Sequence, residues 1–156
     1  MMRFKINLKI DPDFKAQVEP KVIQATAQAA LEYGSAPSPA EVTIVLTDDR
    51  ALHLLNLNYL NQDHPTDVLA FPSGELDPET GRHYLGDIAI SFPQAGVQAE
   101  KGGHSVMAEV QLLVVHGLLH LLGHDHSQPE EQARMWAAQA EILKQLGITL
   151  NLPDMP

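Results

Sequence analysis

The clearest alternation of hydrophobic and polar residues lies near the N-terminus. Residues 3–10 (RFKINLKI) alternate with a period of two, as the residues of a half-buried strand do. The β-branched run at 42–46 and two further segments, at 68–71 and 87–92, also predict strands. The interval 72–82 is rich in turn-forming residues and predicts a loop or hairpin. We therefore expect about four strands.

Between these strands, apolar residues recur with helical spacing. The predicted helices are an alanine-rich segment at 20–33, a segment capped by Asp48 or Asp49 that runs to about Leu60, a segment opened by Pro93, a segment from Ser105 to Leu122, and a final segment that ends near Gly147. The segment at 105–122 is apolar on nearly all sides, which predicts a central buried helix. Gly34 and Gly123 follow two of these helices as C-terminal stops.

The last helix is predicted from its start signal and its spacing. Ser127 and Glu130 form a capping box, and Ala133, Trp136, Ala137, Ala140 and Leu143 keep helical spacing, so Trp136 is expected in the core. Together the elements predict an α+β fold, with a single layer of about four mixed strands packed with about five helices. The length of 156 residues suits one domain over residues 1–156.

Composition narrows the chemistry. Cysteine is absent, which excludes disulfides, Cys-type zinc fingers, iron–sulfur clusters and a thiol nucleophile. The N-terminus has no continuous apolar segment of the signal-peptide kind, and we expect a cytoplasmic protein that does not bind membranes. The net charge of −10 argues mildly against a general polyanion binder, because phosphate affinity depends on cationic contacts.

Three histidines stand out in the string HGLLHLLGHDH, which begins at His116. His116 and His120 are four residues apart, so a helix presents both imidazoles on one face. Gly123 allows the chain to leave the helix in a left-handed turn, which can bring His126 back toward the same point. Three imidazoles with one open position are typical of a catalytic zinc site. We therefore predict one zinc ion per chain, bound on the central buried helix and able to activate water near neutral pH.

The alternative is that these histidines are ordinary core residues, which a single histidine on an apolar helix usually is. Two buried imidazoles in an aliphatic run both need hydrogen-bond partners, and their neighbours offer none. The string also fits the metzincin protease pattern H-E-x-x-H-x-x-G-x-x-H at every position except one, where Gly117 replaces the glutamate general base. Peptide hydrolysis is therefore disfavoured, and the missing side chain at Gly117 is expected to leave space beside the metal for a substrate such as a phosphodiester.

HGLLHLLGHDH resembles the H-G-x-L-H-L-x-G-x-D-H signature of the YbeY family of bacterial rRNA maturation factors. PTDVLAFP (65–72) and LGDIAIS (85–91) are similar to two further segments of that family, in the same order and spacing. The resemblance implies a single-strand-specific, zinc-dependent endoribonuclease with His116, His120 and His126 as metal ligands. It also implies a role in 16S rRNA 3′-end maturation and ribosome quality control.

One position departs from the family pattern. The family's N-x-x-Y segment usually continues with an arginine thought to contact RNA, whereas Leu60 follows Tyr59 in this chain. A cationic donor at a developing oxyanion contributes several kcal/mol to catalysis, so its loss should weaken cleavage. Arg50 and Arg82 are candidate substitutes.

Four further residues that could belong to the site have two possible roles each. Asp125 either accepts a hydrogen bond from a ligand imidazole, which would make it part of the catalytic site, or caps the final helix. His124 is either a solvated neighbour or a proton donor. Thr66 and Asp67 either line the cleft or form a turn before the strand at Val68.

Three functions are compatible with these residues. The first is the endoribonuclease, with RNA and the small ribosomal subunit as partners. The second is a metal-dependent hydrolase of a peptide or small molecule, which the acidic charge and Leu60 favour. The third is a non-catalytic ribosome-biogenesis factor, whose acidic surface suits a basic ribosomal protein or a GTPase as partner.

Overall fold

The computed structural model describes residues 3–63, 66–124 and 127–150. Four strands form one sheet in the order β1-β2-β4-β3. They are β1 (Phe4–Ile10), β2 (Ala40–Thr47), β3 (Val68–Pro72) and β4 (His83–Ser91). β1, β2 and β4 are parallel, and β3 pairs antiparallel with β4 at one edge. The predicted α+β fold with one mixed sheet of four strands is therefore confirmed.

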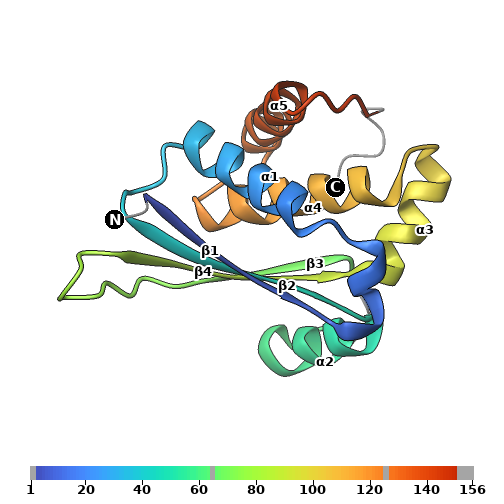
Figure 1. The fold of residues 1–156 in the computed structure, drawn as a ribbon, viewed down its shortest axis with the longest axis horizontal. Coiled ribbons are helices and arrows are strands. Elements are labelled where there is room, and N and C mark those ends of the chain that lie inside the picture. The colour runs from blue at the N-terminus through green and yellow to red at the C-terminus, as the bar shows by residue number, and fades with distance from the viewer. Residues whose placement is uncertain (1–2, 64–65, 125–126, 151–156) are drawn as a thin grey trace.

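Helices cover both faces of this sheet (Figure 1). They are α1 (Pro20–Tyr33), α2 (Asp49–Leu60), α3 (Phe92–Gly102), α4 (Val106–Leu121) and α5 (Pro129–Gln145), preceded by a 3₁₀ helix at Pro12–Gln17 that the sequence did not predict. α1, α4 and α5 lie on one face and α2 lies on the other (Figure 1). The five predicted α-helices are thus all present.

α4 is the central buried helix that its apolar sequence predicts. Every residue from Glu109 to Leu119 is buried, because the sheet, α1, α3 and α5 all pack against this helix. Ser105 caps its first turn by accepting a hydrogen bond from the Ala108 backbone N–H, as expected. Gly123 follows the helix with a φ of +99°, a conformation that favours glycine.

Apolar side chains fill two layers. The larger core lies between the sheet and α1, α4 and α5, and includes Ile44 and Ile88. A smaller cluster of Leu52, Leu69 and Ala89 packs α2 against the opposite face. Since successive strand residues point to opposite faces, the neighbours Ile88 and Ala89 belong to different layers.

The start and orientation of α5 differ from the prediction. Gln128 is the N-cap residue and its side chain makes no capping hydrogen bond, so the expected capping box that begins at Ser127 is wrong. Trp136 is 36% exposed, so its expected place in the core is also wrong. The stripe that faces the core consists of Met135, Ala138, Gln139, Ile142 and Leu143. Alanine is compatible with either face, and the larger Met135 and Ile142 set the buried one.

The junction between α3 and α4 is sharply bent. Gly103 ends α3 with a φ of +73°, and the two helix axes differ by 113°. Within the described part of the chain, no single helix is long and apolar enough to cross a membrane, and only this bent pair together meets the criteria of length and composition.

Candidate metal centre

His116 and His120 converge, as their spacing on α4 predicts. Their Nε2 atoms are 3.1 Å apart, and their ring planes are inclined by 77°. Two imidazole nitrogens bound to one tetrahedral zinc ion at 2.0–2.1 Å would be about 3.3 Å apart. The separation of the two nitrogens therefore fits two ligands of a common ion.

The far side of the His116 ring is held by a residue from α5. His116 Nδ1 lies 2.6 Å from the Gln139 side-chain oxygen, and both residues are buried. The sequence did not identify Gln139, because the stripe of α5 predicted to face the core lies about one residue away from the stripe that does so. The available signal was a glutamine between Met135 and Ile142, on the stripe that faces the core.

A cleft of about 360 Å³ lies over the two histidines. Its described lining residues are Leu60, Thr66, Asp67, Val68, Leu69, Ala70, Pro72, His116, Gly117 and His120. The cleft thus runs between α4 and the edge strand β3. Thr66 and Asp67 line it, which confirms one of their two predicted readings.

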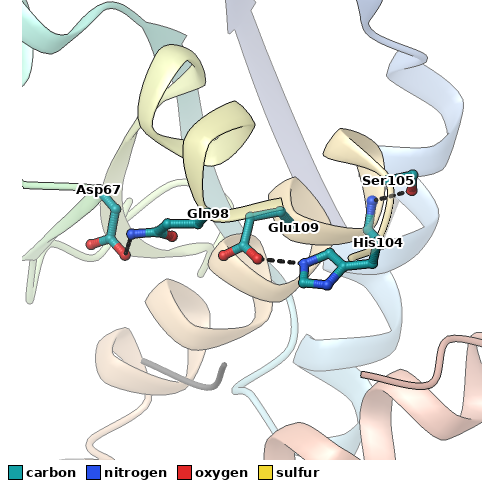
Figure 2. A network of polar contacts seen from close by, with 6 residues as sticks. Asp67, Gln98, His104, Ser105 and Glu109 are labelled. Carbon is teal, nitrogen blue, oxygen red and sulfur yellow. Dashed lines mark hydrogen bonds and ion pairs between the residues drawn. The ribbon is translucent and has the colours of Figure 1, made fainter. Parts of the chain in front are cut away.

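Asp67 is fixed at this cleft by hydrogen bonds to both of its carboxylate oxygens. Oδ1 accepts from the Val68 backbone N–H at 2.8 Å, and Oδ2 accepts from the Gln98 side-chain amide at 3.1 Å. Gln98 lies on α3, so this helix helps to orient the Asp67 carboxylate (Figure 2). These contacts orient a hydrogen-bond acceptor in the lining of the cleft that also contains the two imidazoles.

Gly117 lines the cleft, but the direction of its missing side chain is occupied. A Cβ atom at this position would lie 2.7 Å from Ile88 Cγ2 on β4. The expectation that the absent side chain leaves space for substrate is therefore wrong. The glycine instead lets α4 approach the sheet closely, and a glutamate at this position would collide with Ile88.

The charge of the cleft differs from that of a typical RNA site. Leu60 lines the cleft at the position where the family pattern has arginine, and none of the described lining residues is a lysine or arginine. Arg82 donates a hydrogen bond to the Ala40 carbonyl, and neither Arg82 nor Arg50 is among the lining residues. Among the described residues, Asp67 is the charged side chain of the cleft.

The remaining predicted site residues, His126 and Asp125, lie outside the described residues. Within the described ranges, no group of three or more histidine, cysteine, aspartate or glutamate residues is placed to hold a metal ion. The complete ligand set His116, His120 and His126 therefore stays a prediction. His124 borders a different hollow, together with Glu131 and Arg134.

Two groups outside this cleft have shifted pKa values. Burial raises the pKa of the Tyr84 hydroxyl, and its hydrogen bond to Asp87 adds to the rise. The backbone N–H of Glu79 lowers the pKa of the exposed Asp77 carboxyl. These residues belong to β4 and to the segment between β3 and β4.

The chain is similar in sequence and fold to known proteins. The family model described as "Endoribonuclease YbeY" matches residues 6–147. A protein named Endoribonuclease YbeY from a Roseiflexus species is 40% identical over 150 residues, which cover 92% of this chain and 94% of the relative. A protein of the same name from Chloroflexus aurantiacus is 41% identical over 154 residues, which cover 94% of this chain and 98% of the relative. The solution structure of TM1509 from Thermotoga maritima shares the fold with a TM-score of 0.58 at 23% identity, covering 92% of this chain and 91% of that one.

Proposed function

Because this chain belongs to the YbeY family, we propose that it is a zinc-dependent endoribonuclease specific for single-stranded RNA. We further propose that it acts in 16S rRNA 3′-end maturation and ribosome quality control. The observation that carries the proposal is the 3.1 Å approach of the His116 and His120 Nε2 atoms in a cleft. His126 is the proposed third ligand, for one zinc ion per chain.

The described residues around the histidines would hold and orient the reactants. Zinc in this site would supply a Lewis acid that polarises a phosphoryl oxygen and activates the attacking group. Asp67 faces the cleft as a fixed acceptor and would orient the hydroxyl that attacks phosphorus. Asp125 is the proposed acceptor for a ligand imidazole. In the reaction, a P–O bond forms to the attacking oxygen, which gives up its proton, while the bond to the leaving oxygen breaks and the leaving oxygen takes up a proton.

The experiment compares three substrates with the same zinc-loaded protein. Single-stranded RNA from the 3′ end of a 16S precursor, the same RNA as a duplex, and unfolded casein are each incubated with and without a chelator. We expect cleavage of the single strand only, abolished by the chelator. Cleavage of casein, or RNA cleavage that survives chelation, would contradict the proposal.

The charge of the cleft favours a second candidate, a metal-dependent hydrolase of another substrate. Leu60 replaces a cation, Asp67 adds a negative charge, and the chain as a whole carries −10. A phosphodiester anion gains little from such a lining. Hydrolysis of casein or of neutral ester substrates, with intact RNA, would select this candidate.

The acidic chain also suits basic partners in ribosome assembly. A net charge of −10 complements a basic ribosomal protein, and a biogenesis GTPase is the other proposed partner. Binding of the small-subunit precursor by wild type and by the His116→Ala variant separates the roles. Association that survives the loss of zinc, without any cleavage by the wild type, would indicate a non-catalytic binding factor.

A further inference from the structure

We infer that Gln139 is a positioning residue of the metal centre, which holds His116 in the tautomer that can bind a metal. This inference rests on the proposed metal-binding function. It assigns α5 a part in the site, although the ligands described so far lie on α4. It also explains a polar side chain on the buried stripe of α5 that packing does not require.

The contact is short and shielded from solvent. His116 Nδ1 and Gln139 Oε1 are 2.6 Å apart, with His116 4% exposed and Gln139 fully buried. Water therefore competes poorly for either atom. An amide oxygen can only accept, so the proton of the neutral ring lies on Nδ1. Nε2 then carries the lone pair, and Nε2 is the atom that faces His120.

The other end of the amide shows what this orientation costs. Gln139 Nε2 is buried and has no hydrogen-bond partner in the part of the chain that the structure describes. A buried donor without a partner costs about 1–3 kcal/mol. Turning the amide over would give this nitrogen a partner in His116 Nδ1, but the ring proton would then move to Nε2 and block metal binding. The orientation present is the one that favours the ligand.

Packing alone would be served by an apolar residue. Met135, Ala138 and Ile142 surround Gln139 on the same stripe and are buried without polar groups. A leucine has nearly the same volume as glutamine and would bring no orphaned donor. The amide is therefore accounted for by His116, in the way that outer-shell acceptors orient metal-binding histidines.

The test is the Gln139→Leu variant beside a matched Gln111→Leu control. Gln111 is also buried, and its side-chain amide donates a hydrogen bond to Thr26 Oγ1 on α1 at 2.9 Å. Zinc affinity is measured by competition with a chromogenic chelator. We expect Gln139→Leu to bind zinc about 10- to 100-fold more weakly, the usual cost of losing an outer-shell partner. Gln111→Leu should bind zinc as the wild type does.

A second readout needs no metal. Nitrogen-15 NMR of zinc-free protein, with neutral histidines, reports which ring nitrogen of His116 carries the proton. We expect the Nδ1–H tautomer in wild type and in Gln139→Glu, which keeps an oxygen acceptor. The Nε2–H tautomer should grow in Gln139→Leu. Gln139→Met, unbranched and without a strong acceptor, replaces the leucine variant if that variant does not fold.

The outcomes separate this inference from the proposed function. Unchanged zinc affinity and an unchanged His116 tautomer in Gln139→Leu would overturn the role of Gln139. A wild type that binds no zinc would overturn the proposed function, while the tautomer measurement would still decide what Gln139 does. Loss of thermal stability without any change in affinity or tautomer would show a purely structural role and overturn the inference.

Discussion

One histidine near each end of α4 makes a short hydrogen bond, with different consequences. Near the N-terminal end, His104 Nε2 lies 2.6 Å from Glu109 Oε1, with side chains 11% and 2% exposed (Figure 2). Near the C-terminal end, His116 Nδ1 lies at the same distance from Gln139, while its Nε2 faces a second imidazole in a cleft. The first arrangement joins two side chains of neighbouring segments, and the second borders a cleft.

The comparison shows what distinguishes a ligand from a core histidine. A short hydrogen bond to an oxygen acceptor is common to both histidines. At the C-terminal end, a hydrogen bond to Gln139 fixes one ring nitrogen of His116. The other ring nitrogen of His116 faces a second imidazole, His120, four residues further along the helix. The acceptor differs too, because Gln139 is neutral and would orient the ring without adding a charge beside the proposed metal.

The largest expected effect comes from His116→Ala. Removal of this imidazole should abolish most zinc binding and lower RNA cleavage at least about 1000-fold, because the metal supplies the main charge stabilisation. Zinc is measured by elemental analysis of the purified variant, and cleavage with single-stranded RNA. Full zinc occupancy in His116→Ala would discredit the ligand assignment.

The opposite histidine should affect stability alone. His104→Ala removes one hydrogen-bond partner of the buried Glu109 carboxyl group, so we expect a loss of about 1–3 kcal/mol in the free energy of unfolding. Urea denaturation measures this loss, and zinc titration should give an unchanged stoichiometry. A His104→Ala variant that loses zinc but keeps its stability would break the comparison between the two ends.

Gly117→Ala should disturb the packing of α4 beneath the cleft. The added methyl group would overlap Ile88 Cγ2 on β4, and overpacking of this kind costs about 1–3 kcal/mol. Gly96→Ala, inside α3 with no atom within 4 Å of the added carbon, is the control and should stabilise by about 0.5–1 kcal/mol. Thermal denaturation distinguishes the two. Equal stabilisation by both would show that Ile88 yields to the methyl group.

The smallest expected effect is the gain in RNA affinity when an arginine replaces Leu60. Leu60→Arg places a positive charge at the cleft, so single-stranded RNA should bind about three- to tenfold more tightly, with one further phosphate contact in its salt dependence. Leu54→Arg, on the same helix and equally exposed (48% against 47%), is the control because Leu54 does not line the cleft. Binding is measured by fluorescence anisotropy at several salt concentrations. Equal gains in both variants would indicate nonspecific attraction.

The sequence by itself determined the features that depend on neighbours along the chain. The period of two at β1, the apolar run of β2 and the caps at Asp48 and Ser105 predict these elements within one to three residues of their observed bounds. The pairing of His116 with His120 also follows from helix geometry alone. Such features rest on local backbone hydrogen bonds and helical spacing, which are written in short stretches of residues.

Only the tertiary structure decided which residues from distant segments meet at the cleft. Alanines on α5 are compatible with several orientations, so packing against α4 chose the face that carries Gln139 and left Trp136 outside. Contact between α4 and β4 filled the space at Gly117 with Ile88. The physical reason is that burial depends on the shapes of surfaces brought together by folding, which no single segment specifies.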